Sequence, residues 1–341
     1  MLKSILEVQK RIVPDLLQVM MKRYHILRYI RLMQPVGRRS LSQTLDMTER
    51  VLRGETQFLK EQNLLNISSS GMTLTEEGYR VLDELDDIVR DLSGFPQLEK
   101  DLAEALQVEQ CIVVMGDSET SDWDKSELAR ACINSIKKVL EDKNIIAVTG
   151  GSTVAAVADH FPPDFGKKDL LFVPARGGLG SDLKHQANLI CSKMAERTGG
   201  NHMVLYVPDH VSEETYQSFI HEPSIQEVIS AIQSADCLLH GIGDALTMAK
   251  RRNSSPEVIE KLTRHQAVAE AFGYYFNEEG EVVHKITTIG IQLENLSNIP
   301  HIYAVAGGKS KAKAIKAYMK VAPKNTVLVT DEAAAMEIIK G

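Results

Sequence analysis

Apolar positions in the first ninety residues recur at helical spacing and are interrupted by helix breakers at short intervals. Over residues 24–33 this spacing predicts a helix whose apolar side chains face inward, with Arg28 and Arg31 facing outward. Pro35 and Gly37 end the pattern, because neither residue continues a helix. A first helix followed by a turn is therefore expected at the start of the chain.

Two further helices are predicted after that turn. RRSLSQTLD reads as a short helix, and TERVLRGETQFLKEQNLL reads as a longer helix with Thr48 at its N-cap. Arg50, Arg53 and Gln57 then share one exposed face of the longer helix. Its packing face is expected to consist of Val51, Leu52, Phe58 and Leu59.

The segment NLLNISSSGMTLT predicts two short strands around a Ser-Ser-Gly turn, before EEGYRVLDELDDIV resumes as a helix. Helix, short helix, helix and wing is the order of a winged helix-turn-helix, whose third helix enters the major groove. The side chains expected to face DNA are Arg38, Arg39, Ser42, Thr48, Arg50, Arg53 and Gln57. A small helical adaptor with merely solvated arginines is the plainer alternative.

From Gln110 onward the pattern changes to short apolar, β-branched runs separated by helical stretches. The expected strands are CIVVM, IIAV, LLFVPA, MVLYV, CLLHGIG, TTIGIQ, IYAVAGG and TVLVT. Such alternation predicts a Rossmann-like α/β domain with a mostly parallel sheet. The predicted organisation is a winged helix-turn-helix over residues 1–92, a linker helix over 93–107 and the α/β domain over 108–341.

Charge is distributed unevenly along the 341 residues. The formal net charge is −7, which by itself argues against a nucleic-acid partner, but residues 22–60 hold nine basic and three acidic side chains. Basic charge concentrated in one short stretch is the footprint of a DNA-binding module. The four cysteines form no CxxC pair, so neither a metal site nor a disulfide framework is expected.

Four of the expected strands end in glycine-containing loops, namely TGGST (149–153), RGGLG (176–180), HGIGD (240–244) and AGGKSK (306–311). In an open parallel sheet, ligands bind at the carboxyl ends of the strands, where such loops gather. Gly150 and Gly151 permit close backbone approach, Ser152 and Thr153 add hydroxyl donors, and the helix that follows points free N–H groups at an anion. We therefore expect a phosphate-binding loop.

Several charged and polar residues near these loops are further ligand candidates. Arg176 and Lys311 suit a phosphate or carboxylate, Arg251 adds another cation, and Glu270 and Gln186 suit sugar hydroxyls. Alternatives stay open at this point. Arg251 and Glu270 could form a structural ion pair, and solvated roles are favoured for Arg252 and Lys309. A surface or core role is likewise favoured for His185 over a role as general base.

The segments GRRSLS, TERVLRGE, VTGGST, FVPARGGLG, HGIGDALTMAKRRN, EAFGYYFN and AVAGGKSKA together resemble the SorC family of bacterial transcriptional regulators, over nearly the whole chain. The resemblance implies a sugar-binding domain related to phosphosugar isomerases and deaminases. It also implies a repressor of a glycolytic operon with fructose 1,6-bisphosphate as effector and no other cofactor. The implied effector contacts are Gly150, Gly151, Ser152, Thr153, Arg176, Gln186, Arg251, Glu270 and Lys311.

A sugar-phosphate isomerase or deaminase with an appended DNA-binding domain is the alternative function. The related isomerases carry a DGADE-like acidic loop, whereas HGIGDA here keeps only Asp244, so a positioned acid–base pair is not expected. A third alternative is a DNA-binding protein whose α/β domain only oligomerises. The expected partners are operator DNA, a sugar phosphate and further copies of the chain, since regulators reading two half-sites are symmetric dimers or tetramers. With no apolar run long enough to span a bilayer, a cytoplasmic protein is expected.

Overall fold

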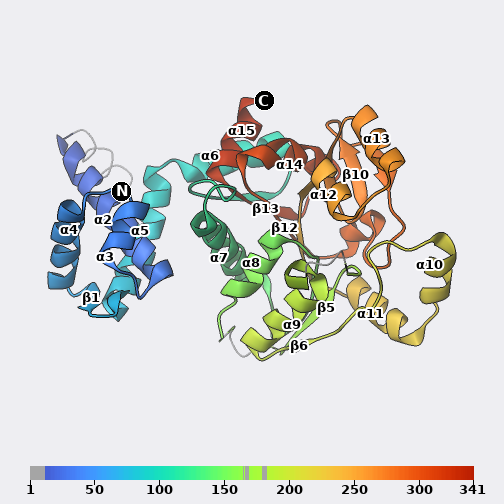
Figure 1. Cartoon of the computed structure of the whole chain (residues 1–341), viewed down its shortest axis with the longest axis horizontal. Helices are drawn as coiled ribbons and strands as arrows, with labels where there is room; N and C mark the ends of the chain where they lie inside the picture. Colours follow the sequence, from blue (N-terminus) through green and yellow to red (C-terminus); the bar gives the residue numbers. More distant parts are fainter. Residues whose placement is uncertain (1–11, 164, 166–168, 179–182) are drawn as a thin grey trace. The chain divides into compact units, whose positions relative to one another are not determined.

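The computed structural model describes residues 12–163, 165, 169–178 and 183–341 and divides into two compact units, the first ending at Gln97 and the second beginning at Leu98 (Figure 1). Leu179 and Gly180 of the second glycine loop lie outside the described residues. So do residues 1–11 at the start of the chain. All four cysteines are buried and unbridged. No helix among the described residues combines the length and the apolarity that crossing a bilayer requires.

The first unit has the element order that the sequence predicts: α2 (Pro14–Met33), α3 (Arg38–Thr44), α4 (Glu49–Glu61), β1 (Leu65–Ser68), β2 (Gly71–Leu74) and α5 (Glu76–Leu92). Strands β1 and β2 pair antiparallel around the Ser-Ser-Gly turn and form the wing. The Thr48 side chain accepts a hydrogen bond from the Val51 backbone N–H, so it caps α4 as expected.

Two predictions about helix faces in this unit are wrong. Val51 and Phe58 of α4 are exposed, and the packing face is formed by Leu52, Thr56 and Leu59. Phe58 packs outside the core against Arg23, whose guanidinium carbon lies 3.7 Å from the centre of the Phe58 ring. On α2, Arg28 is buried. Arg31 does not point to solvent either, because it forms ion pairs with Asp83 and Asp86 of α5.

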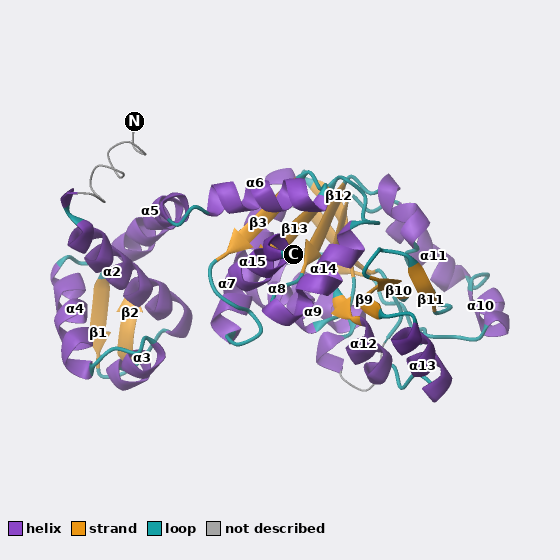
Figure 2. Ribbon diagram, turned by 90° about the horizontal axis from the view of Figure 1, so that it is seen from above, coloured by secondary structure: helices purple, strands orange, loops and turns teal. Residues whose placement is uncertain are grey.

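The second unit is built on a seven-stranded sheet in the order β3-β13-β12-β7-β4-β5-β6, and every neighbouring pair is parallel. Figure 2 shows β3, β13 and β12 of this sheet. Its strands are β3 (Gln110–Val114), β4 (Lys143–Val148), β5 (Asp169–Pro174), β6 (Asn201–His202), β7 (Cys237–Gly241), β12 (His301–Val305) and β13 (Thr326–Asp331). The predicted parallel α/β class is therefore confirmed.

Helices α7 (Asp122–Val139), α8 (Ser152–His160), α9 (Ala187–Thr198), α11 (Pro223–Gln233) and α15 (Glu332–Lys340) pack on this sheet. From residue 95 onward the chain also forms α6 (Phe95–Leu106), α10 (Glu213–Phe219), α12 (Ala245–Arg251), α13 (Pro256–Arg264) and α14 (Ala312–Met319). The apolar faces of α7, α8 and α9 pack on one another and on alternate residues of β4, β5 and β7, so that side chains such as Ile136, Val157 and Phe172 have no exposure.

Two predicted strands are largely absent. In MVLYV the sheet pairing stops at His202, because Leu205 exchanges its backbone hydrogen bonds with the Asn188 side chain instead of with a neighbouring strand. In TTIGIQ only an isolated bridge between Gly290 and Arg176 forms. Apolar runs of this length satisfy their backbone groups in loops as well as in sheets when a side-chain partner is near.

A second sheet was not predicted. It is antiparallel, in the order β11-β10-β9-β8, with β8 (Gly243–Asp244), β9 (Ala267–Ala271), β10 (Tyr274–Asn277) and β11 (Val282–Lys285). Helices α12 and α13 pack against it around Leu262 and Tyr275. Because β8 follows β7 at once, this sheet lies beside the carboxyl edge of the large sheet.

The four glycine loops meet at that edge. They follow β4, β5, β7 and β12, which are contiguous in the sheet order β12-β7-β4-β5 and run parallel. The expectation that the four loops share one edge is confirmed.

Candidate ligand site and DNA-binding surface

A cavity of about 260 Å³ opens between the glycine loops. It is called the outer cavity here. Its walls come from the loop after β4, the end of β7, helix α12, strand β9 and the loop after β12. Predicted site residues that line it are Gly150, Gly151, Ser152, Thr153, Arg251, Glu270 and Lys311.

The loop after β4 brings backbone and hydroxyl groups to this cavity. At Gly150 a Cβ would lie 2.6 Å from the His185 carbonyl oxygen, and at Gly151 the backbone φ is +129°, so both positions require glycine. Helix α8 begins at Ser152 directly after them. The first N–H groups of a helix have no partner within it, so the start of α8 with Ser152 and Thr153 is suited to an anion.

Cationic side chains complete the outer cavity. Lys311 lies at the start of α14 and Arg251 at the end of α12, where Arg251 is exposed. Burial lowers the pKa of Lys311, and the nearby charges of Lys125 and Arg251 lower it further, against the opposing effect of Glu119 and Asp331. The lowered pKa shows that several cationic side chains lie close together around Lys311. Such a cluster of positive charge is suited to a multiply charged anion.

The loop that carries Lys311 is held by a buried carboxylate. Asp331 has no exposure, and its Oδ2 accepts hydrogen bonds from the backbone N–H groups of Ser118 and Gly308 and from the Ser118 hydroxyl. Glu119 accepts another from the Ser310 backbone N–H. Lys309 points elsewhere, toward Glu337, with most of its side chain exposed, as the sequence suggested.

A smaller inner cavity adjoins the outer one, and the two share Gly150, Gly241, Met248 and Glu270. The predicted residues Arg176 and Gln186 line it. Thus the structure places all nine predicted ligand residues along two adjoining cavities, seven on the outer one and the remaining two on the inner one alone.

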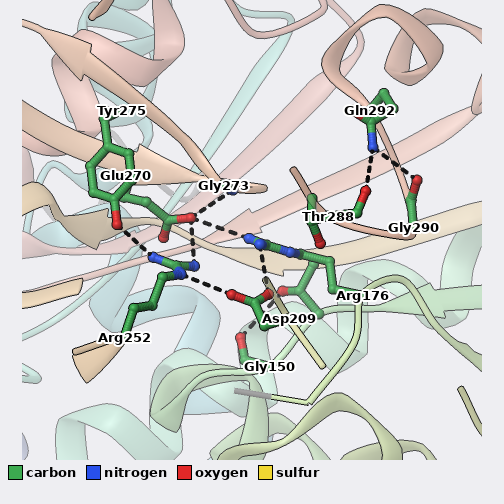
Figure 3. Close-up of polar contacts among 11 residues, drawn as sticks. Gly150, Arg176, Asp209, Arg252, Glu270, Gly273, Tyr275, Thr288, Gly290 and Gln292 are labelled. Carbon is green, nitrogen blue, oxygen red and sulfur yellow. Dashed lines mark hydrogen bonds and ion pairs between the residues drawn. The ribbon is translucent and has the colours of Figure 1, made fainter. Parts of the chain in front are cut away.

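Four charged side chains form a buried network along the inner cavity (Figure 3). Arg176 contacts Asp209 at 2.6 Å and Glu270 at 3.2 Å. Arg252 contacts the same two carboxylates, at 2.8 Å and 2.9 Å. Each of the four side chains is at most 7% exposed. Arg176 Nε has no hydrogen-bond acceptor among the described residues, so a buried donor remains for a ligand.

Glu270 connects the network to the outer cavity. Its Oε1 accepts hydrogen bonds from Arg176, Arg252 and the Gly273 backbone N–H. In the described part of the chain, no donor reaches Oε2, which faces Gly243, the residue paired with Glu270 across β8 and β9. An ionised carboxylate oxygen in this position accepts hydrogen bonds only, so it suits a ligand hydroxyl.

Two of these network residues were missed or misjudged from the sequence. Arg252 is buried and doubly paired rather than solvated, and the suggested Arg251–Glu270 ion pair is replaced by Arg252–Glu270. Asp209 was not considered, since it lies in a loop with no recognisable motif. The only local signal was the adjacent pair Arg251 and Arg252, which cannot both face the same way at a helix end. Asp244, the one acidic residue in HGIGDA, caps α12 through the Thr247 backbone N–H.

The predicted DNA-facing residues of the first unit are exposed, with one exception. Arg38, Arg39, Thr48, Arg50, Arg53 and Gln57 are exposed on α3, α4 and the turn between them. Ser42 is buried, and its hydroxyl donates to the Arg39 carbonyl oxygen, so its side chain does not share the exposed surface of the other six. It lies next to the buried Leu41 on the inner face of α3.

The structure also sorts the basic residues of segment 22–60 into two groups. Lys22 and Arg23 pair with Glu55, Arg31 pairs with α5, and Arg28 is buried. The remaining basic side chains are exposed and make no ion pair within the described residues. These are Arg38, Arg39, Arg50, Arg53 and Lys60.

A groove-reading helix with a wing, together with a cavity lined by cations and one free carboxylate oxygen, defines a DNA-binding regulator with a small-molecule site. Comparison with known families agrees with this class. The model of the sugar-binding domain family, Sugar-bind, matches residues 90–340, and that of the CggR N-terminal DNA-binding domain matches residues 19–89. The chain therefore belongs to the SorC family of sugar-binding transcriptional regulators.

Individual relatives are similar along the whole chain. The central glycolytic genes regulator of Bacillus subtilis (strain 168) is 54% identical over 339 residues, and the regulator of that name from Priestia megaterium is 53% identical over 340 residues; each alignment covers 99% of both chains. A crystal structure of a SorC family regulator from Enterococcus faecalis aligns with a TM-score of 0.68 and 50% identity, covering 71% of this chain and 99% of that one.

The comparisons exclude two of the alternatives that the sequence left open. These relatives are transcriptional regulators with a DNA-binding domain rather than enzymes, so the sugar-phosphate isomerase alternative does not hold. The helical adaptor alternative for the first unit does not hold either, because a DNA-binding family model covers it.

Proposed function

We propose that the protein represses a glycolytic operon and that fructose 1,6-bisphosphate, bound along the two cavities, controls its affinity for operator DNA. The observation that carries the proposal is the spatial order of the charged and polar groups along the two cavities. The α8 N-terminus, Lys311 and Arg251 offer one anion site. The free Nε of Arg176 offers a second donor in the inner cavity, and Glu270 Oε2 lies where the cavities meet. A sugar with a phosphate at each end and hydroxyls between them matches this order.

Similarity to the central glycolytic genes regulators supports the same proposal, because their name places them at glycolytic genes. Operators of such regulators are read by symmetric assemblies, so we propose a dimer or tetramer that places two α4 helices on two half-sites. Effector binding would then change how protomers pair on DNA. No further cofactor is needed for this cycle.

A thermal-shift screen of the full chain against glycolytic intermediates tests the effector. Fructose 1,6-bisphosphate is expected to give the largest stabilisation, about 2.7 kcal/mol at a hundredfold excess over its dissociation constant. Fructose 6-phosphate is the matched comparison, since it lacks one phosphate. Equal shifts with both sugars would contradict the assignment of two anion sites. Absence of a shift with every phosphosugar would favour an α/β domain that only oligomerises.

Operator release is tested separately by fluorescence anisotropy on a DNA fragment from upstream of a glycolytic operon. Adding the bisphosphate is expected to lower the affinity for that fragment and to leave binding to unrelated DNA unchanged. An operator affinity that does not respond to a saturating effector would contradict the proposed control.

A further inference from the structure

Asp209 and Arg252 line the inner cavity but not the outer one, as Arg176 and Gln186 do, yet neither is among the ligand residues expected from the sequence. Both side chains are 5% exposed. Arg252 Nε donates to Asp209 Oδ2 at 2.8 Å, its Nη2 donates to Glu270 Oε1 at 2.9 Å, and its Nη1 donates to the Tyr275 hydroxyl at 3.1 Å. One guanidinium therefore joins the loop before α10, strand β9 and strand β10.

The bonds of Glu270 show what this arrangement accomplishes. Arg176, Arg252 and the Gly273 N–H all reach Oε1, so the carboxylate cannot rotate without losing three hydrogen bonds. Its second oxygen is thereby kept toward Gly243 and the outer cavity. A carboxylate held in this way is preorganised for a ligand hydroxyl, which reduces the ordering cost of binding.

Asp209 holds the Arg176 guanidinium in place in a similar way. Its Oδ1 lies 2.6 Å from Arg176 Nη2 and its Oδ2 accepts from Arg252, so the two guanidinium groups are bridged by one carboxylate. The Asp209 backbone N–H donates to the Gly178 carbonyl oxygen at 2.8 Å, which fixes the loop that carries the carboxylate. The four charges cancel, as a buried ionic group requires.

We propose that Asp209 and Arg252 are positioning residues: they orient Glu270 for the sugar hydroxyls and Arg176 for the second phosphate of the effector, without contacting the phosphate bound in the outer cavity. The inference rests on the proposed function, because it assumes a sugar phosphate in the cavities. It assigns the two neighbouring arginines different tasks. Arg251 faces the outer cavity and its anion, whereas Arg252 anchors the end of α12 in the network.

Arginine is required at position 252 for a geometric reason. A planar guanidinium donates to several acceptors in fixed directions at once, whereas a lysine ammonium is a compact charge that cannot span Asp209, Glu270 and Tyr275 together. Burial alone would lower the pKa of Arg252, but the carboxylates of Glu270 and Asp209 raise it above its ordinary value, so the side chain stays charged.

The test is Arg252→Lys in the full chain, which keeps the charge and removes the fork. Affinity for the sugar phosphate that stabilises the wild type most is expected to fall about 10- to 100-fold, the loss of one charge-assisted hydrogen bond. Affinity for inorganic phosphate, which needs only the outer cavity, is expected to change less than twofold. Arg264→Lys, in an exposed ion pair on α13, is the matched control and should change neither affinity.

Parallel losses for the sugar phosphate and for inorganic phosphate would overturn the proposal, because a general loss of structure acts on both ligands alike. Unchanged affinity for the sugar phosphate would also overturn it. A wild type that binds inorganic phosphate but no sugar phosphate would refute the proposed function itself, and the positioning role with it.

Asp209→Asn gives a second, independent arm. It has nearly the same shape but weakens the bridge between the two arginines. The same selective loss is expected, and in the double variant the second substitution should add less than it does alone, since both act through Glu270 and Arg176. Fully additive losses would contradict a shared network.

Discussion

Lys311 carries a positive charge where the folded protein disfavours one. Burial lowers its pKa from the ordinary value of 10.5, and the charges of Lys125 and Arg251 act in the same direction. A bound phosphate would reverse this balance by supplying the missing counter-charge. Lys311 therefore lowers the stability of the ligand-free protein and raises its affinity for a phosphate, a combination that is common in binding sites.

Lys311→Met is expected to raise the melting temperature of the ligand-free protein near pH 7, by about 2–4 °C per kcal/mol of relief. It should also weaken effector binding about 10- to 100-fold. The stability cost is present while Lys311 is charged in the fold, so it should fade as the pH rises toward 10.5. Calorimetry of both proteins between pH 7 and 10 checks this sign.

Lys309→Met is the control for that substitution, because it removes a charge from the same loop at an exposed position. It should leave effector affinity unchanged. A Lys311→Met protein that is less stable than the wild type at every pH would contradict the inferred cost of the buried charge.

The side chains of helix α4 fall into a structural set and a DNA-facing set. Leu52, Thr56 and Leu59 pack inward, Thr48 caps the helix, and Arg50 and Arg53 remain exposed. Lys22 and Arg23, which lie near it, are engaged by Glu55. The exposed arginines are therefore the ones available to a groove.

Arg50→Ala and Arg53→Ala are each expected to weaken operator binding by about 1–3 kcal/mol if the side chain reads a base. A side chain that contacts only phosphate should instead lower the slope of log affinity against log salt by about 1. Anisotropy titrations at several salt concentrations distinguish the two cases. Arg80→Ala, on an exposed arginine of α5, is the control, and an equal loss there would mean that α4 has no special role.

Prediction from the sequence succeeded for elements with local signals and failed for those without them. The helix order of the first unit, the wing and six of the seven large-sheet strands followed from periodicity and turn residues. The antiparallel sheet did not, since β8 has two residues and pairs with β9 across two intervening helices. MVLYV and TTIGIQ looked like strands, but their backbone partners are decided by residues far away.

In the proposed function, the binding of DNA to the whole molecule and the binding of effector oppose each other. A single coupling free energy describes both effects. Linkage requires that the factor by which effector weakens operator binding equals the factor by which operator weakens effector binding. Typical couplings of about 1–3 kcal/mol correspond to about 5- to 150-fold in each direction. The requirement holds whatever the assembly size.

This reciprocity is testable by measuring the effector dissociation constant with and without saturating operator, and the operator constant with and without effector. The two ratios should agree, and analytical ultracentrifugation under the same conditions reports the proposed dimer or tetramer. Effector affinity that ignores saturating operator, alongside operator affinity that responds to effector, would show that a further component takes part.

The sequence by itself determined the two kinds of unit, the glycine loops and the residue types that gather at them, because helical and strand periods and turn residues act over a few positions. The tertiary structure alone decided which charges meet. Arg176 and Glu270 are 94 positions apart, and Arg252 and Asp209 are 43 apart. It also buried Ser42 and the side chain of Arg252 and left Arg251 exposed. Contacts at such separations depend on how whole elements pack, and no local pattern records that packing.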